Sequence, residues 1–249
     1  MVAKVSMFRI WATVVAILAA FLAASILAAT VLAPAARAQA GGPEAGCTGQ
    51  IVLDPGHGGT DTGASNSTYG LLEKDQNLDV ALRLEALLEA KGYNVCKTRT
   101  GDASLSNNDR YTYANTTGAS VLVSVHMNGS SNTATDYTTT LFGKPRKDQE
   151  FAQTVFESLS TLPSATGTGT IQTKLPYQFA SGVLLKSNMP AIIAESVFIT
   201  SDYEGLRLSD GTGTRQQQIA EALKSGIESY LAANPPQPDG DTGGPPGRA

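Results

Sequence analysis

The amino-acid sequence predicts an α/β fold, in which a mostly parallel sheet carries helices on both of its faces. Short runs of apolar and β-branched residues, as at 50–53 and 120–125, have the length and composition of buried strands. Other segments, such as 78–90, place apolar residues at helical spacing. Strands and helices therefore alternate along the chain, which is the pattern of βαβ units.

Each element follows from its local pattern. The strand over 50–53 runs into a glycine-rich segment, and Gly92 follows the first helix as a stop signal. The last helix carries apolar residues on one face, at 219, 223, 227 and 230. We expect strands over 50–53, 93–98, 120–125, 138–142, 182–185 and 191–197. We expect helices over 78–90, 110–116, 149–162 and 216–231.

Residues 1–38 have the features of a secretory signal peptide. Lys4 and Arg9 precede an apolar run over 10–32, and Ala-Arg-Ala at 36–38 places small residues where a signal peptidase cleaves. The run is also long enough to span a bilayer, so an uncleaved membrane anchor is the alternative. We expect cleavage after residue 38 and export to the periplasm, the cell wall or the medium.

The rest of the chain is predicted to hold one domain over 47–233 and a tail over 234–249. The length suits a single core, and the proline- and glycine-rich tail has almost nothing apolar to bury, which indicates disorder. Loss of the three basic residues of the leader changes the formal net charge from −4 to −7. That charge excludes a nucleic-acid-binding protein, and we expect no adhesion to anionic wall polymers through charge alone. We expect a monomer.

Cys47 and Cys96 are the only cysteines of the chain. In an exported protein an even pair favours a disulfide, which would close a loop of about 50 residues and stabilise the fold by ~4 kcal/mol. Metal binding by these thiols is the alternative. It is disfavoured because neither cysteine has another thiol or a histidine near it in sequence.

The two histidines of the chain, His57 and His126, come directly after predicted strands, in IVLDPGH and VLVSVH. The carboxyl ends of parallel strands meet at one edge of a sheet, so we expect both imidazoles there. This matched pair indicates a metal site. A catalytic zinc site needs three protein ligands and one open position, and the third ligand should be a carboxylate.

Three carboxylates could supply that ligand. Glu73 lies between the first strand and the first helix, from where its side chain can fold back over the strand end. Asp54 and Asp61 are closer to His57 in sequence, but Asp54 precedes a proline turn and is better suited to orient His57 or to brace the loop. Glu73 also has charged neighbours, and the alternative is a solvated charge near a helix start.

Glu195 lies in the middle of the apolar segment PAIIAESVF. A carboxylate in such a strand is costly unless it is paired or functional, and burial raises its pKa towards the range of a group that accepts and returns a proton. The alternative is a structural ion pair, for which Lys186 is the local candidate.

Five segments, taken in order, resemble the zinc-dependent N-acetylmuramoyl-L-alanine amidases of the amidase-3 type. They are DPGHGGTDTGA, EKDQNLDVALRLEALLEAKGY, RTGD beginning at Arg99, SVHMNG and MPAIIAESVFITS, and the resemblance covers nearly all of residues 50–231. The family has a glycine and an asparagine where this chain has Val197 and Thr200. We expect these two departures to change local strand geometry and substrate fit rather than metal binding.

The resemblance implies a six-stranded sheet and a function. His57, Glu73 and His126 would bind one zinc ion, and Glu195 would be the catalytic acid/base. The substrate would be the amide bond between N-acetylmuramic acid and L-alanine, in peptidoglycan or its fragments. Asn128, just past a ligand, is a candidate hydrogen-bond partner of the substrate from its position alone.

Two rival functions remain at this point. A zinc peptidase that cuts within the stem peptide would use similar ligands. An inactive, amidase-like protein that binds or regulates the wall would need no chemistry, and the presence of all four chemical residues argues against it. A phosphate-binding loop at PGHGG is excluded because no Lys-Ser/Thr pair follows it.

Overall fold

The computed structural model describes residues 41–235 of the chain. The predicted signal peptide, and residues 236–249 of the predicted tail, lie outside the described residues. Over 41–235, every helix is too short or too polar to cross a membrane.

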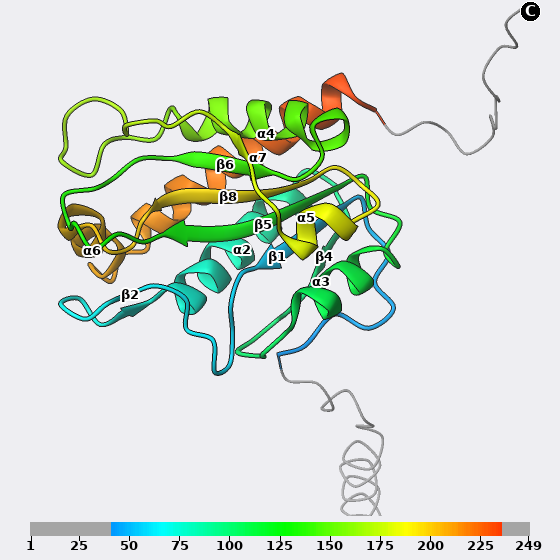
Figure 1. Ribbon diagram of the computed structural model, residues 1–249, viewed down its shortest axis with the longest axis horizontal. Helices are drawn as coiled ribbons and strands as arrows, with labels where there is room; N and C mark the ends of the chain where they lie inside the picture. Colours follow the sequence, from blue (N-terminus) through cyan, green and yellow to red (C-terminus); the bar gives the residue numbers. More distant parts are fainter. Residues whose placement is uncertain (1–40, 236–249) are drawn as a thin grey trace, which may run out of the picture. The chain divides into compact units, whose positions relative to one another are not determined.

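The elements alternate along the chain as predicted (Figure 1). The strands are β1 (Ile51–Pro55), β2 (Ser65–Asn66), β3 (Leu71–Leu72), β4 (Val95–Lys97), β5 (Val121–Asn128), β6 (Thr139–Phe142), β7 (Tyr177–Gln178) and β8 (Ala191–Phe198). The helices are α2 (Glu73–Glu89), α3 (Asn107–Ala114), α4 (Pro145–Leu159), α5 (Gly182–Lys186), α6 (Asp202–Leu208) and α7 (Thr214–Ala233).

Six of the strands form one mixed sheet in the order β4-β1-β5-β8-β6-β7, which confirms the predicted fold class. β4, β1, β5 and β8 are parallel neighbours, whereas β6 runs antiparallel to β8 and pairs in parallel with the edge strand β7. β2 and β3 form a separate small hairpin ahead of α2.

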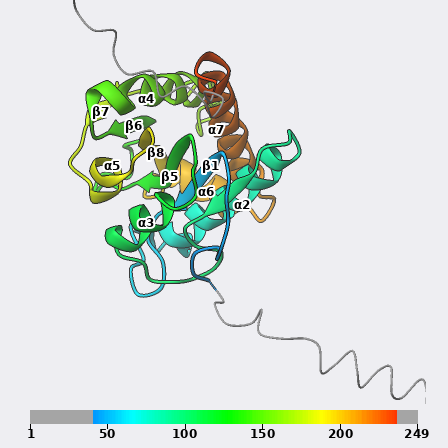
Figure 2. The same cartoon turned by 90° about the vertical axis from the view of Figure 1, so that its right-hand side faces the viewer.

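Helices cover both faces of this sheet (Figure 2). On one face α7 packs against both α2 and α4, and α3 and α5 lie together on the other face. Strand side chains alternate between the faces. Ile51 and Leu53 therefore belong to the core under α2, α4 and α7, whereas Val52 packs in the second core, which includes residues of α5.

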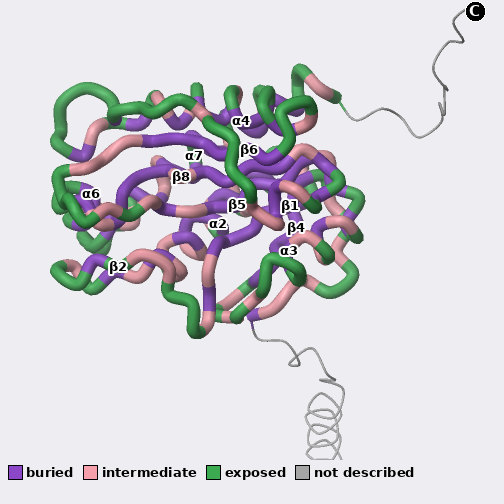
Figure 3. Tube along the Cα trace, in the orientation of Figure 1, coloured by how far each residue is buried: buried purple, intermediate pink, exposed green. Residues whose placement is uncertain are grey.

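On the face that carries α3 and α5, the strand side chains change from apolar to polar along the strands. Near the amino ends its side chains are apolar, as at Val52 and Leu122, and they are buried in the second core. Towards the carboxyl ends the same face presents Asp54, His126 and Glu195, which line a cavity. The strands of the sheet are buried along most of their length (Figure 3). The chemistry predicted from the sequence lies at the carboxyl edge of this sheet, where polar residues follow the apolar ones.

The predicted strand over 182–185 is wrong, because Gly182–Lys186 is the short helix α5. A run of four apolar residues has no periodicity that separates a strand from a buried helical turn. Here Val183 and Leu184 are buried in the second core, which a helical turn permits. The first helix also begins at Glu73, five residues before the predicted start, and β7 and α6 were not predicted.

The predicted disulfide is present between Cys47 and Cys96. It joins the segment that precedes β1 to the edge strand β4. Cys96 is fully buried in the second core, so metal binding by this thiol pair is excluded.

Candidate metal centre and active-site cavity

His57 and His126 meet because β1 and β5 are parallel neighbours, with Pro55 opposite Val125 in the ladder. The two imidazole rings lie edge to face with their centroids 4.9 Å apart. Gly56 makes this approach possible, since a Cβ atom there would lie 2.1 Å from Nε2 of His126. The chain then turns through His57 itself, the one non-glycine residue of the described range with a positive φ, 61°.

Glu73 bridges the two rings from the first position of α2. Its Oε2 lies 3.2 Å from Nε2 of His57, and its Oε1 lies 3.0 Å from Nδ1 of His126. The backbone amides of Ala64 and Met127 donate to the same carboxylate at 2.8 and 3.1 Å. Its exposed fraction is 3%, which excludes the alternative that Glu73 is a solvated charge.

A second glycine keeps the carboxylate and the imidazole free of steric conflict. Gly63 has a φ of +64°, and a Cβ atom there would lie 2.5 Å from Oε2 of Glu73 and 2.6 Å from the ring of His57. The conformation and the space therefore both require glycine at this position.

His57, Glu73 and His126 each offer one ligand atom, and these atoms lie within 4.8 Å of one another. Two imidazole nitrogens and one carboxylate oxygen form a donor set that fits zinc. The hydrogen bond to Glu73 raises the pKa of His57 to about 9. A metal ion binds neutral imidazole, so its binding must displace this proton.

Asp61 orients His57 from the far side of the ring. Its Oδ2 lies 2.9 Å from Nδ1 of His57, the nitrogen that does not face Glu73. A carboxylate in this position fixes the ring orientation and leaves the other nitrogen to face a metal. Of the two aspartates considered from the sequence, it is thus Asp61 and not Asp54 that contacts the histidine.

We predict that Asp61→Asn weakens zinc binding ~10- to 100-fold, as expected for the loss of such a supporting carboxylate. The measurement is a chelator competition that yields the zinc dissociation constant. Asp75→Asn is the matched control, because Asp75 is an exposed carboxylate nearby that contacts neither histidine. Equal zinc affinities in the two variants would show that Asp61 does not support the site.

Asp54 braces the loop that carries His57. It is fully buried and accepts hydrogen bonds from Thr98, Ser124 and Arg110 at 2.6, 2.6 and 2.7 Å. Burial raises the pKa of Asp54, but the Arg110 guanidinium and these hydrogen bonds outweigh it and hold the pKa below its usual range. Arg110 also donates to the backbone oxygen of His57 at 2.7 Å, so the pair fixes the loop after β1.

Arg99 supports the same loop from the other side. Its guanidinium is buried and donates to the backbone oxygens of Pro55, Gly56 and Lys74 at 2.9, 3.0 and 2.7 Å. The role of Arg110 was missed in the sequence, where it marked only the start of a predicted helix. No local pattern could have paired it with Asp54, 56 residues away.

Glu195 lies beside this cluster, since it is opposite His126 in the ladder between β5 and β8. Its Oε2 is shielded from solvent and has no hydrogen-bond partner among residues 41–235. Burial raises the pKa of Glu195, and the negative charge of Glu73 raises it further. An unpartnered carboxylate next to a candidate metal centre is free to exchange a proton with a bound substrate.

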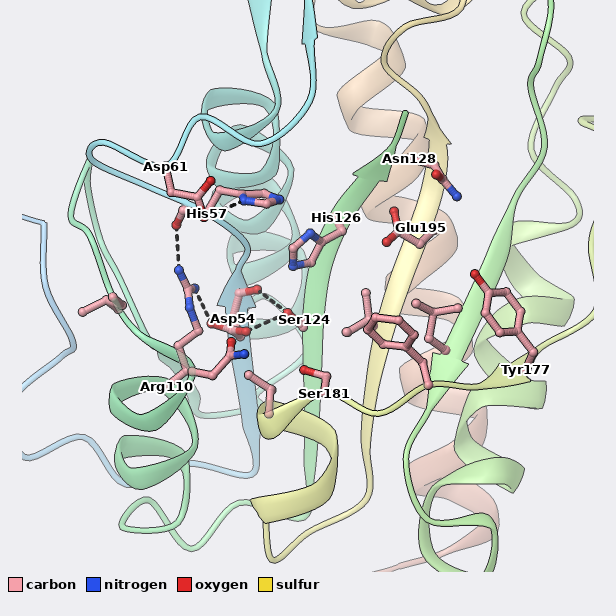
Figure 4. A pocket seen from close by; sticks show the side chains of 16 residues that line it. Asp54, His57, Asp61, Arg110, Ser124, His126, Asn128, Tyr177, Ser181 and Glu195 are labelled. Atoms are coloured by element: carbon pink, nitrogen blue, oxygen red, sulfur yellow. Dashed lines mark hydrogen bonds and ion pairs between the residues drawn. The ribbon is translucent and has the colours of Figure 1, made fainter. Parts of the chain in front are cut away.

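A cavity of about 470 Å³ opens over these residues (Figure 4). His57, His126 and Glu195 line one part of it, and Asn128 lies at its rim next to Glu195. Tyr177 lies across the cavity from His57 (Figure 4), and the apolar residues Leu141, Phe179 and Ile193 also line the cavity. The cavity therefore combines a metal-binding end with an apolar end that can hold a neighbouring part of a substrate.

Residues 51–229 match the protein-family model described as N-acetylmuramoyl-L-alanine amidase. The uncharacterized protein YqiI of Bacillus subtilis is 33% identical over 180 residues, which cover 72% of this chain and 84% of that protein. The probable cell wall amidase LytH of Staphylococcus epidermidis is 31% identical over 184 residues. This match covers 74% of this chain and 58% of that protein, so the chain spans little more than half of LytH.

Comparison with solved structures also finds N-acetylmuramoyl-L-alanine amidases. The N-acetylmuramoyl-L-alanine amidase AmiC2 of Nostoc punctiforme superposes with a TM-score of 0.66 at 30% identity. The superposition covers 73% of this chain and 96% of that one.

Proposed function

The chain belongs to the amidase-3 family of N-acetylmuramoyl-L-alanine amidases, and we propose that its activity depends on one zinc ion held by His57, Glu73 and His126. The enzyme hydrolyses the amide bond between N-acetylmuramic acid and L-alanine in peptidoglycan. The observation that supports the zinc proposal is the convergence of the three ligand atoms within 4.8 Å, with Glu195 beside them.

A bound zinc ion supplies Lewis-acid chemistry, which polarises a carbonyl group and lowers the pKa of water to about 7. Glu195 accepts a proton from the attacking water and returns it to the departing alanine nitrogen. Its raised pKa suits this exchange, because the carboxyl must hold the proton between the two steps. Asp54, Arg110 and Arg99 keep the His57 loop in place, and Asn128 is positioned to donate to the substrate at the cavity rim.

We also propose that the enzyme acts outside the cytoplasm, as a secreted or anchored protein. The Cys47–Cys96 disulfide supports this proposal, because such bonds persist in oxidising compartments. The predicted signal peptide is consistent with it, and so is the name of one relative, a probable cell wall amidase.

Product analysis tests the proposed function. The protein, stripped of metal and then supplied with zinc, should release stem peptides with a free amino-terminal alanine from muropeptides, and it should be inactive without the metal. A muramoyl dipeptide should be cleaved, whereas a stem tetrapeptide without the sugar should not. Cleavage of the sugar-free peptide would instead identify a peptidase, and full activity without metal would overturn the zinc proposal.

A further inference from the structure

Two stretches of the chain carry basic side chains and no acidic ones. Residues 137–147 contain Lys144, Arg146 and Lys147, and residues 158–194 contain Lys174 and Lys186. The described range as a whole is acidic, with 14 Lys and Arg against 20 Asp and Glu. Positive charge is therefore concentrated in these two stretches, against the trend of the rest of the domain.

The fold brings the two stretches together. β6 pairs with β7, and the side chain of Gln178 in β7 donates to the backbone oxygen of Gly143, just after β6, at 2.9 Å. The same Gly143 lies against α5, because a Cβ atom there would lie 2.8 Å from Cβ of Leu184. The turn before α4, the edge strand β7 and α5 thus form one continuous part of the surface (Figure 1).

We call Lys144, Arg146, Lys147, Lys174 and Lys186 the basic surface. Lys147 is paired with the buried Asp148, whereas the other four are exposed and form no ion pair within residues 41–235. Lys174 is held in place by two aromatic rings, with its Nζ 5.6 Å from the ring centroid of Tyr137 and 4.7 Å from that of Tyr177. These charges are available to a partner from solution.

A second cavity lies within this surface. It has a volume of about 550 Å³, and its lining includes Lys144, Arg146, Lys147 and Gln178. Gln178 separates it from the active-site cavity, since the flanking residues Tyr177 and Phe179 line the active site. The basic surface therefore begins where the apolar end of the active-site cavity stops.

The basic surface is also long. The backbone amide of Lys174 donates to Thr138, at the start of β6, and Lys144 follows the other end of that strand. These two positions are six residues apart along a mostly extended chain, which corresponds to ~20 Å. A single carboxylate would contact one end of such a surface, whereas a linear polymer with repeated negative charges would contact its whole length.

We propose that the basic surface binds an anionic phosphodiester polymer of the cell wall, and so keeps the active-site cavity against its substrate. The proposal rests on the location proposed above. The overall negative charge of the protein argues against binding of an anionic polymer. Salt screens charges that lie more than ~10 Å away, however, so the polymer interacts mainly with the charges of the surface that it contacts. Binding therefore depends on the basic residues that gather around β7, apart from the acidic residues of the rest of the domain.

The test measures binding of the full mature chain to purified cell-wall sacculi. One batch of sacculi retains its phosphodiester polymers, and the other has been stripped of them. The variant is Lys144→Glu/Arg146→Glu, and the matched control is Lys91→Glu/Lys224→Glu, which makes the same charge change on the α2 and α7 side of the sheet (Figure 2). Thermal unfolding of each variant checks that it folds.

We expect the wild type and the control to bind the polymer-bearing sacculi and the basic-surface variant to bind roughly 30-fold more weakly. Added salt should weaken wild-type binding, and stripped sacculi should bind the wild type as weakly as the variant does. Equal binding by variant and control, or no effect of salt on the wild type, would overturn the proposal. Undiminished binding to stripped sacculi would also overturn it and would assign the anion to stem-peptide carboxylates. Binding needs no hydrolysis, so the proposed function can fail in the product assay while this result stands.

Discussion

Alanine in place of His57 or His126 should abolish both zinc binding and amidase activity. In the proposed site each imidazole is one of three protein donors, and its removal would leave only two. The loss of affinity should exceed the roughly 100-fold upper range for a supporting residue such as Asp61. Metal content after dialysis and hydrolysis of muropeptides measure the two effects, and thermal unfolding checks that the variants fold.

Glu73→Ala should weaken zinc binding severely for the same reason, and it has a further consequence. The alanine variant removes the acceptor for the amides of Ala64 and Met127, so it also loosens the contact between α2 and β5. Glu73→Gln keeps most of the shape and removes the charge, and it should lose zinc with less loss of stability. Unchanged zinc affinity in both variants would mean that another carboxylate is the third ligand, and Asp61 is then the nearest candidate.

The core of the site could be predicted because its residues lie at the ends of strongly patterned strands. IVLDPGH and VLVSVH place each histidine directly after an apolar run, and parallel pairing of β1 and β5 brings the two ends together. The same reasoning predicted that Glu195 is buried, from its apolar flanks. Local pattern and strand geometry suffice for these residues.

The supporting residues could not be predicted in this way. Asp54 and Asp61 lie at similar distances from His57 in sequence, and only the turn through His57 decides that Asp61 reaches its ring. Arg110 contacts Asp54, which lies 56 residues away in sequence, because α3 packs on the sheet. Such contacts depend on tertiary packing, which a single sequence does not reveal.

The apolar end of the cavity was missed for the same reason. Tyr177 lies in a strand of two residues, which is too short to show a period of two. The strand forms because the backbone amide of Lys174 donates to Thr138 and that of Phe179 donates to Phe142, contacts that lie 36 to 37 residues apart. Total charge was equally uninformative about the basic surface, because a sum carries no information on where the charges lie.

Glu195→Gln should keep the zinc ion and lose the activity. The amide has nearly the same shape as the carboxyl, and Glu195 lies beside the three proposed ligands and outside the group that they form. The glutamine amide cannot accept the proton of the attacking water. We therefore expect kcat to fall by ~10²–10⁴, the range for loss of general acid–base catalysis. KM should change far less, because the contacts of the bound substrate are mostly retained.

The comparison with Glu73→Gln makes this prediction specific. The two variants make the same chemical change at two glutamates that both lie beside His126, and they should have opposite effects on zinc content. If Glu195→Gln loses its zinc, Glu195 is a ligand and the role of Glu73 must be reassigned. If it retains both zinc and full activity, Glu195 is structural and another group must move the proton. We expect zinc to be kept and activity to be lost, because Oε2 of Glu195 is buried without a hydrogen-bond partner. A purely structural carboxylate in this position would lower the stability of the fold with nothing to offset the cost.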